Sequence, residues 1–386
     1  MKPEPFEIAI PDSALSDLRE RLAQSRWPND PGNPDWRYGV PRSDLAALVD
    51  YWRDDFDWRA QEAAMNRHRH YQTEIDGVPI HFMHVPAVGP NAIPLVLTHG
   101  WPWTFWDFRD VLGPLSNPAA YGQPDAPAFE LIVPSLPGFG FSSPLDQTGI
   151  GYARTAELWD CLMREQLGFE RYAAYGGDWG ALVSAALGHA YAEHLIGIHE
   201  SLPGFLGLDY AAIREEDFAE DEAGWWDHLQ SIQPHIASHM AVHSLDPQTL
   251  GYALHDSPLG LAAWILERRR AWSDCEGDVE RCFSKDDLLT TISLYWLTDT
   301  ITSSLRFYWE NAHHPWQPSH PRQPPCEAPT AIAVFPRDTV LVPRRLAERH
   351  AKIERWTVMP RGGHFAPAEQ PELLVDDLRA FFAGRS

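Results

Sequence analysis

The stretch 175–180, with the sequence Tyr-Gly-Gly-Asp-Trp-Gly, constrains the fold of this chain more than any other feature. It follows the apolar run 172–175 and leads into 181–187, whose composition is typical of a helix. An apolar strand, a tight turn and a helix form the nucleophile elbow, whose usual pattern is Gly-x-Ser-x-Gly. The flanking positions need glycine because a Cβ there would collide with the neighbouring strand or helix. The pattern predicts an α/β sheet with Asp178, in place of the serine, exposed at its edge.

Asp178 has two interpretations at this point. A carboxylate is ionised at neutral pH, so it needs no base to attack an electrophilic carbon and form an ester. An aspartate at this position can instead cap the helix that follows it. The elbow pattern alone does not decide between a nucleophile and a helix cap.

Composition and charge exclude several classes of protein. Of the 386 residues 44% are hydrophobic, with 17 Trp, 17 Phe and 12 Tyr, which is typical of a well-packed globular protein. A net charge of −23 argues against nucleic acid as a partner. Four cysteines without a C-x-x-C pair argue against a disulfide scaffold or a thiolate zinc site. We expect a cytoplasmic protein, because there is no secretory signal and no apolar run of roughly 18 residues.

Hydrophobic periodicity divides the chain into four segments. We expect an N-terminal helical and meander segment, the first part of an α/β core, a helical cap and the second part of the core, at residues 1–75, 76–205, 206–316 and 317–386. Short apolar strands alternate with helices, which predicts a mostly parallel sheet covered on both faces. The expected core strands are 94–98, 129–133, 172–175, 195–199, 330–335 and 353–358.

Three further local patterns give expectations. Asp76-Gly77 between two short alternating runs predicts a β-hairpin. The stretch 285–310 has helical spacing throughout. We interpret Arg-His-Arg-His at 67–70 as a solvated basic loop and not as a metal site.

The elbow also predicts its partners, because an acid and then a histidine follow the nucleophile along the chain in this arrangement. Asp338 follows the expected strand 330–335, and His364 follows 353–358 after two glycines. Both lie beyond the carboxyl ends of strands, where α/β sheets place their sites. Each could alone be a turn residue or a surface histidine. Together, and in this order, they are expected to act with Asp178.

His-Gly-Trp-Pro at 99–102 follows another expected strand. In such folds a loop after an early strand and the residue after the nucleophile supply two backbone N–H groups to an oxyanion. The expected donors are the amides of Trp101 and Trp179.

These motifs together resemble the microsomal-type epoxide hydrolases. The resemblance rests on 176–180, 99–102 and Arg-Gly-Gly-His-Phe at 361–365, with further similar stretches at 256–262 and 306–311, and it covers nearly the whole chain. It implies an α/β-hydrolase core with a helical cap, which hydrolyses a small-molecule epoxide with water to a vicinal diol without a cofactor. Mammalian members carry a membrane anchor, which we do not expect here. The sequence leaves open whether the chain forms a homodimer.

The resemblance also implies roles for individual residues. Asp178 would be the nucleophile, His364 the base that activates water, and Asp338 the carboxylate that orients it. Two tyrosines of the cap usually donate hydrogen bonds to the epoxide oxygen, because ring opening requires acid assistance. Tyr308 matches one of them, and His239 stands at the expected position of the other. A histidine with a pKa near roughly 6.5 would, when protonated, be a stronger acid than a phenol.

The assignment of His239 has alternatives. Tyr252 or His243 could take the place of the missing tyrosine. His235, His239 and His243 would also share one face of a helix, which is compatible with a metal. No carboxylate completes such a site, and the resemblance requires no metal, so we expect none.

The expected substrate pocket is aromatic, with Trp103, Trp106 and Phe141 as candidate lining residues beside the two amide donors. Trp103 stands where the family commonly has glycine. Two other functions stay open: a dehalogenase with the same nucleophile, and a hydrolase-fold binding protein without activity. The first would need halide-binding donors and not the Tyr308 acid, and the complete set of Asp178, His364 and Asp338 argues against the second.

Overall fold

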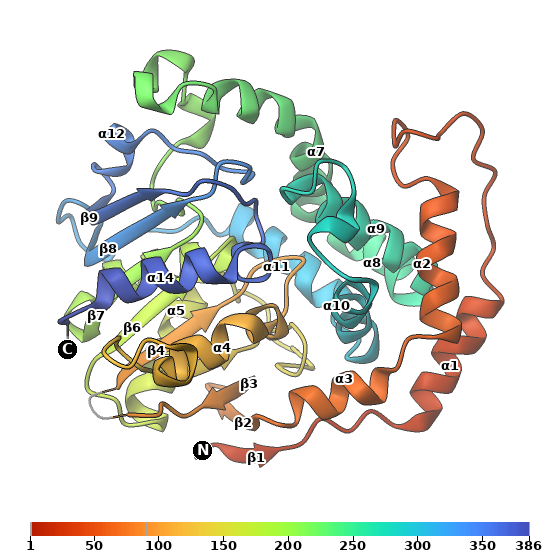
Figure 1. Cartoon of the computed structure of the whole chain (residues 1–386), viewed down its shortest axis with the longest axis horizontal. Helices are drawn as coiled ribbons and strands as arrows, with labels where there is room; N and C mark the ends of the chain where they lie inside the picture. Colours follow the sequence, from red (N-terminus) through yellow and green to blue (C-terminus); the bar gives the residue numbers. More distant parts are fainter. Residues whose placement is uncertain (1, 90–91, 386) are drawn as a thin grey trace.

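The computed structural model describes residues 2–89 and 92–385 (Figure 1). These residues form a sheet in the order β1-β2-β3-β5-β4-β6-β7-β8-β9, parallel from β5 to β9 and antiparallel from β1 to β5. The mostly parallel sheet is therefore confirmed. The strands are β1 Glu4–Phe6, β2 Arg69–Ile75, β3 Val78–Val85, β4 Ile93–Thr98, β5 Phe129–Pro134, β6 Tyr172–Gly176, β7 Leu195–Glu200, β8 Cys326–Val334 and β9 Ala351–Val358.

Helices cover both faces of this sheet and one of its ends. α4 packs with α14 on one face and α5 with α6 on the other, while α7 to α11 lie over the end of the sheet (Figure 1). The helices are α1 Asp12–Ala23, α2 Arg42–Asp54, α3 Trp58–Met65, α4 Arg109–Ser116, α5 Tyr152–Cys161, α6 Trp179–Ala190, α7 Trp225–Leu245, α8 Pro247–Asp256, α9 Pro258–Trp272, α10 Lys285–Leu297, α11 Ile301–His313, α12 Arg344–Ala347, α13 Ala366–Glu369 and α14 Pro371–Phe382. In the described part of the chain, no helix is long and apolar enough to cross a bilayer.

The helices α7 to α11, here called the cap helices, come between β7 and β8 in the chain. The N-terminal helices hold them in place: the Trp52 indole donates to Ser293 Oγ at 2.9 Å, and the Tyr51 hydroxyl donates to Asp286 at 3.0 Å. Since β1 and β2 pair with the core sheet, the N-terminal segment contacts both the sheet and the cap. The segment boundaries at 75, 205 and 316 stay a prediction.

Local expectations were met at the hairpin and failed at two places. Asp76 and Gly77 both have positive φ and join β2 to β3, as the turn sequence predicts. The helical stretch 285–310 is broken between α10 and α11, where Asp299 has a φ of 56°. The solvated basic loop is wrong for His70, which lies in β2, is buried, and has its Nδ1 3.0 Å from His81 Nε2. The spacing of apolar residues does not reveal the break at Asp299. The charged Arg67 and Arg69 beside His70 made the start of β2 resemble a solvated loop.

Strand register brings the predicted loops together. β4 and β6 are parallel neighbours and pair Thr98 with Gly176, so the loop after β4 lies beside the elbow. β8 and β9 pair Val334 with Val358, and their following loops are joined by a bridge between residues 337 and 363. All these loops leave the same edge of the sheet, because the strands are parallel.

Candidate active site

The elbow has the predicted geometry. β6 ends at Gly176 and α6 begins at Trp179, and Asp178 between them has a φ of 51°. This left-handed conformation is strained for a residue with a side chain, and such strain is often found at functional sites. A Cβ on Gly176 would collide with the carbonyl oxygen of Gly180, so the turn requires glycine there. Among the described residues Asp178 accepts no capping bond from α6, so the helix-cap interpretation is wrong.

The Asp178 carboxylate has a different partner on each oxygen. Its Oδ1 accepts a hydrogen bond of 2.7 Å from the Trp101 amide. Its Oδ2 lies 3.4 Å from His364 Nε2, which is an ion-pair distance rather than a well-aligned hydrogen bond. A side chain on Gly100 would collide with this carboxylate, which explains the glycine in His-Gly-Trp-Pro. The Trp179 amide, in the first turn of α6, stays a predicted donor.

His364 lies between two carboxylates. Its Nδ1 is 2.8 Å from Asp338 Oδ1, and both side chains are almost completely buried. Thr339 Oγ1 is 3.2 Å from the same nitrogen. Burial alone would lower the pKa of His364, but Asp338 and Asp178 together raise this pKa to about 10. The three residues predicted from chain order therefore do meet, and the histidine is positively charged at neutral pH when both carboxylates are ionised.

Tyr308 of α11 and His239 of α7 lie on the cap side of the site. Their rings are 5.4 Å apart, and the Trp101 ring lies 5.8 Å from Tyr308 and 5.6 Å from His239. Burial, and secondly the charge of Asp178, raises the pKa of Tyr308 well above its usual value. Burial and the nearby Arg268 lower the pKa of His239 to about 3. At this pKa the His239 ring is neutral, so its hydrogen-bond donor is the imidazole N–H and not an imidazolium.

The alternatives to His239 fit less well. Tyr252 on α8 is 72% exposed. His243 is fully buried and its Nε2 accepts a hydrogen bond of 3.1 Å from the Trp264 indole, so this nitrogen is already engaged. His235 is exposed while His239 and His243 are buried, so the three do not face a common point.

Several of the predicted site residues open onto a cavity of about 730 Å³. Asp178, His364, Tyr308 and His239 line it together with many apolar side chains. The other lining residues are Trp179, Leu182, Leu202, Gly204, Tyr210, Ala211, Ile213, Arg214, Trp226, Leu229, Gln230, Gln233, Ile236, Ala237, Met240, Trp272, Thr339, Val340 and Leu341.

The predicted aromatic lining residues lie elsewhere. Trp103, Trp106 and Phe141 are absent from the described lining of this cavity and are buried in the core. The Phe141 ring packs against Phe6 at 5.3 Å, under the N-terminal segment, and the Trp103 ring lies 5.5 Å from His364, behind it. The predicted role of these three residues in substrate binding is therefore wrong. Aromatic residues close to a motif in sequence often face the core.

Sequence reasoning missed the actual walls of the cavity. Trp272 ends α9, and its ring is 5.3 Å from His364 and 4.7 Å from His239. The wall formed by α7 was also missed, because glutamines and histidines are interspersed among the apolar residues of this helix. Thr339 directly follows Asp338, but no pattern in the sequence marks it.

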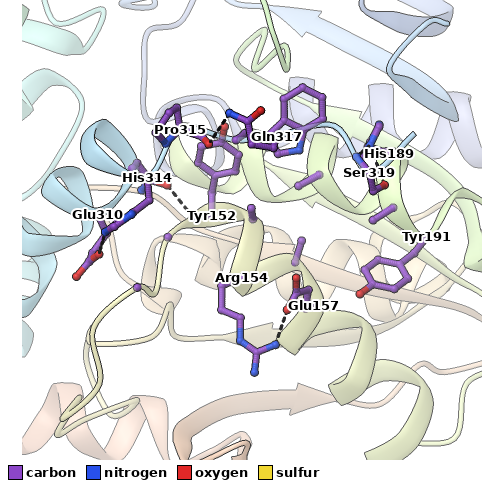
Figure 2. Close-up of a pocket in the computed structure, with 18 residues that line it drawn as sticks. Tyr152, Arg154, Glu157, His189, Tyr191, Glu310, His314, Pro315, Gln317 and Ser319 are labelled. Carbon is purple, nitrogen blue, oxygen red and sulfur yellow. Dashed lines mark hydrogen bonds and ion pairs between the residues drawn. The ribbon is translucent and has the colours of Figure 1, made fainter. Parts of the chain in front are cut away.

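A second, smaller cavity of about 290 Å³ lies outside this site, between the start of α5, the ends of α6 and α11, and the segment 315–319. Figure 2 shows Tyr152, His189 and Glu310 in its walls and the Arg154–Glu157 ion pair at its side. Its described lining contains none of the predicted site residues. The Tyr152 ring stacks on Trp179 at 6.5 Å, so one aromatic pair lies between the two cavities.

Comparison with known proteins agrees with this geometry. The family described as "Epoxide hydrolase N terminus" matches residues 3–108, and "alpha/beta hydrolase fold" matches 93–199. A protein of Stigmatella aurantiaca is 43% identical over 98% of this chain and 84% of its own length. Epoxide hydrolase 1 of Sus scrofa is 35% identical over 98% of this chain and 88% of its own.

Solved structures of epoxide hydrolases are also similar over almost the whole chain. The Aspergillus niger epoxide hydrolase superposes with a TM-score of 0.86 and 29% identity, over 99% of this chain and 96% of that one. The juvenile hormone epoxide hydrolase of the silkworm Bombyx mori gives a TM-score of 0.87 and 26% identity, over 99% and 94% of the two chains. With an α/β-hydrolase sheet, an elbow aspartate and relatives matched over nearly its full length, the chain belongs to the epoxide hydrolase family.

Proposed function

We propose that this protein hydrolyses an epoxide to a vicinal diol through an ester formed on Asp178. One observation carries the proposal: the Asp178 carboxylate faces a carboxylate-paired histidine on the core side, while two neutral hydrogen-bond donors line the same cavity from the cap. The first arrangement suits hydrolysis of an ester, and the second suits opening of a strained ring.

In the first step Asp178 Oδ2 attacks an epoxide carbon, and the bond from that carbon to the ring oxygen breaks. Oδ1 is held by the Trp101 amide, so Oδ2 is the oxygen that is available. The Tyr308 hydroxyl and the His239 N–H donate hydrogen bonds to the departing oxygen, and the alkoxide takes the proton of Tyr308. Loss of the Asp178 charge removes one cause of the raised Tyr308 pKa, so the phenol becomes a better acid as the ester forms.

In the second step water attacks the ester carbonyl carbon of Asp178. Ester formation removes one of the two carboxylate charges that raise the pKa of His364, so His364 can lose its proton, which returns through solvent to the Tyr308 phenolate. The neutral imidazole then accepts one proton from the attacking water. Asp338 holds the imidazole through Nδ1 and stabilises its charged form. The oxyanion forms on Oδ1, where the Trp101 amide already points. Collapse breaks the bond from the carbonyl carbon to Oδ2, which leaves in the diol and takes the remaining proton of the attacking water, so Asp178 is restored as a carboxylate.

The test compares the protein with an Asp178→Ala variant on two substrates, an aryl-substituted epoxide and a terminal chloroalkane. We expect diol from the epoxide and no chloride from the chloroalkane, with both reactions absent in the variant. Chloride release without diol would identify a dehalogenase instead. Binding of the epoxide without either product would support a binding protein without activity.

The sequence-based division into segments 1–75, 76–205, 206–316 and 317–386 and a cytoplasmic location remain predictions. Whether the chain forms a homodimer stays open. The residues Trp101 and Trp179 as oxyanion donors also remain proposals, which the kinetics of ester hydrolysis can test.

A further inference from the structure

The loop that carries His364 is held by an uninterrupted set of hydrogen bonds. Four consecutive backbone N–H groups of this loop each have an acceptor, and the acceptors come from only three residues. Gly362 N donates to Asp274 Oδ2 at 2.9 Å, Gly363 N to Glu369 Oε2 at 3.0 Å, His364 N to Trp272 O at 2.9 Å, and Phe365 N to Glu369 Oε1 at 2.8 Å. The position of the imidazole is therefore set by these three acceptors.

Two of the acceptors belong to the cap side of the molecule. Trp272 is the last residue of α9, and Asp274 lies two residues beyond it. The Asp274 amide donates to Glu369 Oε2 at 2.8 Å, so one carboxylate binds both the end of α9 and the His364 loop. Because Trp272 also lines the cavity beside His239, the same segment contacts both sides of the site.

We propose that Glu369 is a positioning residue that ties the end of cap helix α9 to the His364 loop and so keeps His364 aligned for hydrolysis of the Asp178 ester. This inference rests on the proposed function. Glu369 is not among the described residues that line the cavity, and its carboxylate bonds to the backbone N–H groups on either side of His364, so it acts through the backbone of the loop. Ring opening uses groups on Asp178 and on the cap, so this step does not depend on the exact place of the imidazole.

The electrostatics of Glu369 support this role. Burial raises the pKa of its carboxyl to about 7, against the lowering effect of its three N–H donors, and the Asp338 charge contributes to the rise. Two other groups lie near the Glu369 carboxylate. Cys282 Sγ is 4.0 Å from Glu369 Oε2. Asp274, which donates its amide to the same oxygen, has its Oδ1 4.0 Å from Arg337 Nε. Protonation of Glu369 converts one acceptor oxygen to a donor in front of backbone N–H groups, so the loop loses a hydrogen bond below about pH 7.

The matched pair Glu369→Gln and Glu372→Gln tests the proposal, because Glu372 is exposed and only three residues away. Glutamine at 369 has the same shape but turns one oxygen into an NH₂ group that faces donors. Rapid mixing with excess enzyme separates the rate of ester formation from the rate of ester hydrolysis. We expect Glu369→Gln to hydrolyse the ester about 100-fold more slowly, since a misplacement near 1 Å has an effect of that size. Ester formation should stay within about twofold of the wild-type rate, and Glu372→Gln should behave as wild type.

Two further measurements keep the result interpretable. Asp274→Ala removes the acceptor of Gly362 N and the 4.0 Å ion pair with the exposed Arg337, but leaves the Glu369 carboxylate in place, so it should slow ester hydrolysis in the same selective way if Glu369→Gln does not fold. The fall of ester hydrolysis at acid pH should shift in Glu369→Gln, whereas a purely structural residue would leave the pH profile unchanged. Equal slowing of both steps, or no slowing of either, would overturn the proposal. Absence of any ester in the wild type would instead overturn the proposed function, and this inference with it.

Discussion

The two sides of the cavity hold buried histidines with opposite properties. His364 on the core side lies between Asp338 and Asp178, which raise its pKa to about 10 against the effect of burial. His239 on the cap side lies among the rings of Trp101, Trp272 and Tyr308, where burial and Arg268 lower its pKa to about 3. Both are nearly inaccessible to solvent. The neighbours, not the depth of burial, decide which histidine can carry a proton.

This contrast separates two chemical tasks. A histidine beside carboxylates can exchange a proton with water, which ester hydrolysis requires. A histidine among aromatic rings stays neutral and can only polarise an oxygen by donating a hydrogen bond, which suits ring opening. Replacements on the two sides are therefore expected to affect different steps.

The largest effect is expected for His364→Gln. Steady-state turnover should fall by about ten-thousand-fold, because water is no longer activated, while ester formation continues. A brief exposure to epoxide followed by mass spectrometry of the Asp178 peptide should show an accumulated alkyl ester. Undiminished turnover would remove His364 from the mechanism.

Tyr308→Phe should have the second largest effect, on the opposite step. Loss of the phenolic proton should slow ester formation by about 100-fold to 1,000-fold. Ester hydrolysis, measured from the decay of preformed ester, should stay near the wild-type rate. Slower hydrolysis with unchanged ester formation would contradict the assignment of this tyrosine to ring opening.

His239→Phe should slow ester formation by about tenfold to 100-fold, since Tyr308 still donates to the epoxide oxygen. His243→Phe is the matched control, because His243 lies one helical turn away, also contacts the rings of Trp101 and Tyr308, and bonds to Trp264 instead. We expect the control to keep ester formation nearly unchanged and His239→Gln, which retains a donor, to recover part of the rate. The reverse ranking of the two histidines would identify His243 as the donor.

Part of this site could be predicted from the sequence, because its residues are fixed by chain order and turn geometry. A strand, two glycines and a helix define the place of Asp178, and Asp338 and His364 follow strands that end on the same edge. The protonation state of His239 could not be predicted, because it depends on Arg268 and on rings from other helices.

In the fold, too, the features set by neighbouring residues could be predicted from the sequence, and those set by residues distant in the chain could not. The hairpin at 76–77 and the core strands follow from local turn chemistry and apolar runs. The burial of His70 and the placement of Phe141 depend on the N-terminal segment packing over the sheet, which no local pattern encodes. The role of Glu369 depends on a contact with residue 274, which is distant in the chain.

The last expected effect concerns the dependence of stability on pH, which has opposite signs for a histidine with a lowered pKa and one with a raised pKa. Burial lowers the pKa of His70 from 6.5 to about 4, so the unfolded chain binds a proton there first as the pH falls. The free energy of unfolding should drop by about 3 kcal/mol from this group between pH 6.5 and pH 4. His364, with its raised pKa, should contribute stability fully below pH 6.5 and lose it as the pH rises through about 10.

Urea unfolding across this range of pH, with His70→Asn for comparison, checks the signs. The variant should have a shallower loss of stability at acid pH and the same behaviour at alkaline pH. An equally steep acid loss in the variant would show that His70 takes up its proton in the folded state as readily as in the unfolded chain.

The role of Asp178 as nucleophile can be tested most directly by single-turnover hydrolysis of an epoxide in water labelled with the heavy isotope oxygen-18, with enzyme in excess. If Asp178 Oδ2 attacks the epoxide and water then attacks the ester carbonyl, the heavy oxygen enters the Asp178 carboxylate. The diol formed in that turnover then carries only ordinary oxygen. Heavy oxygen in the diol, with an unlabelled Asp178 peptide, would mean that water opens the epoxide directly and would contradict the ester mechanism.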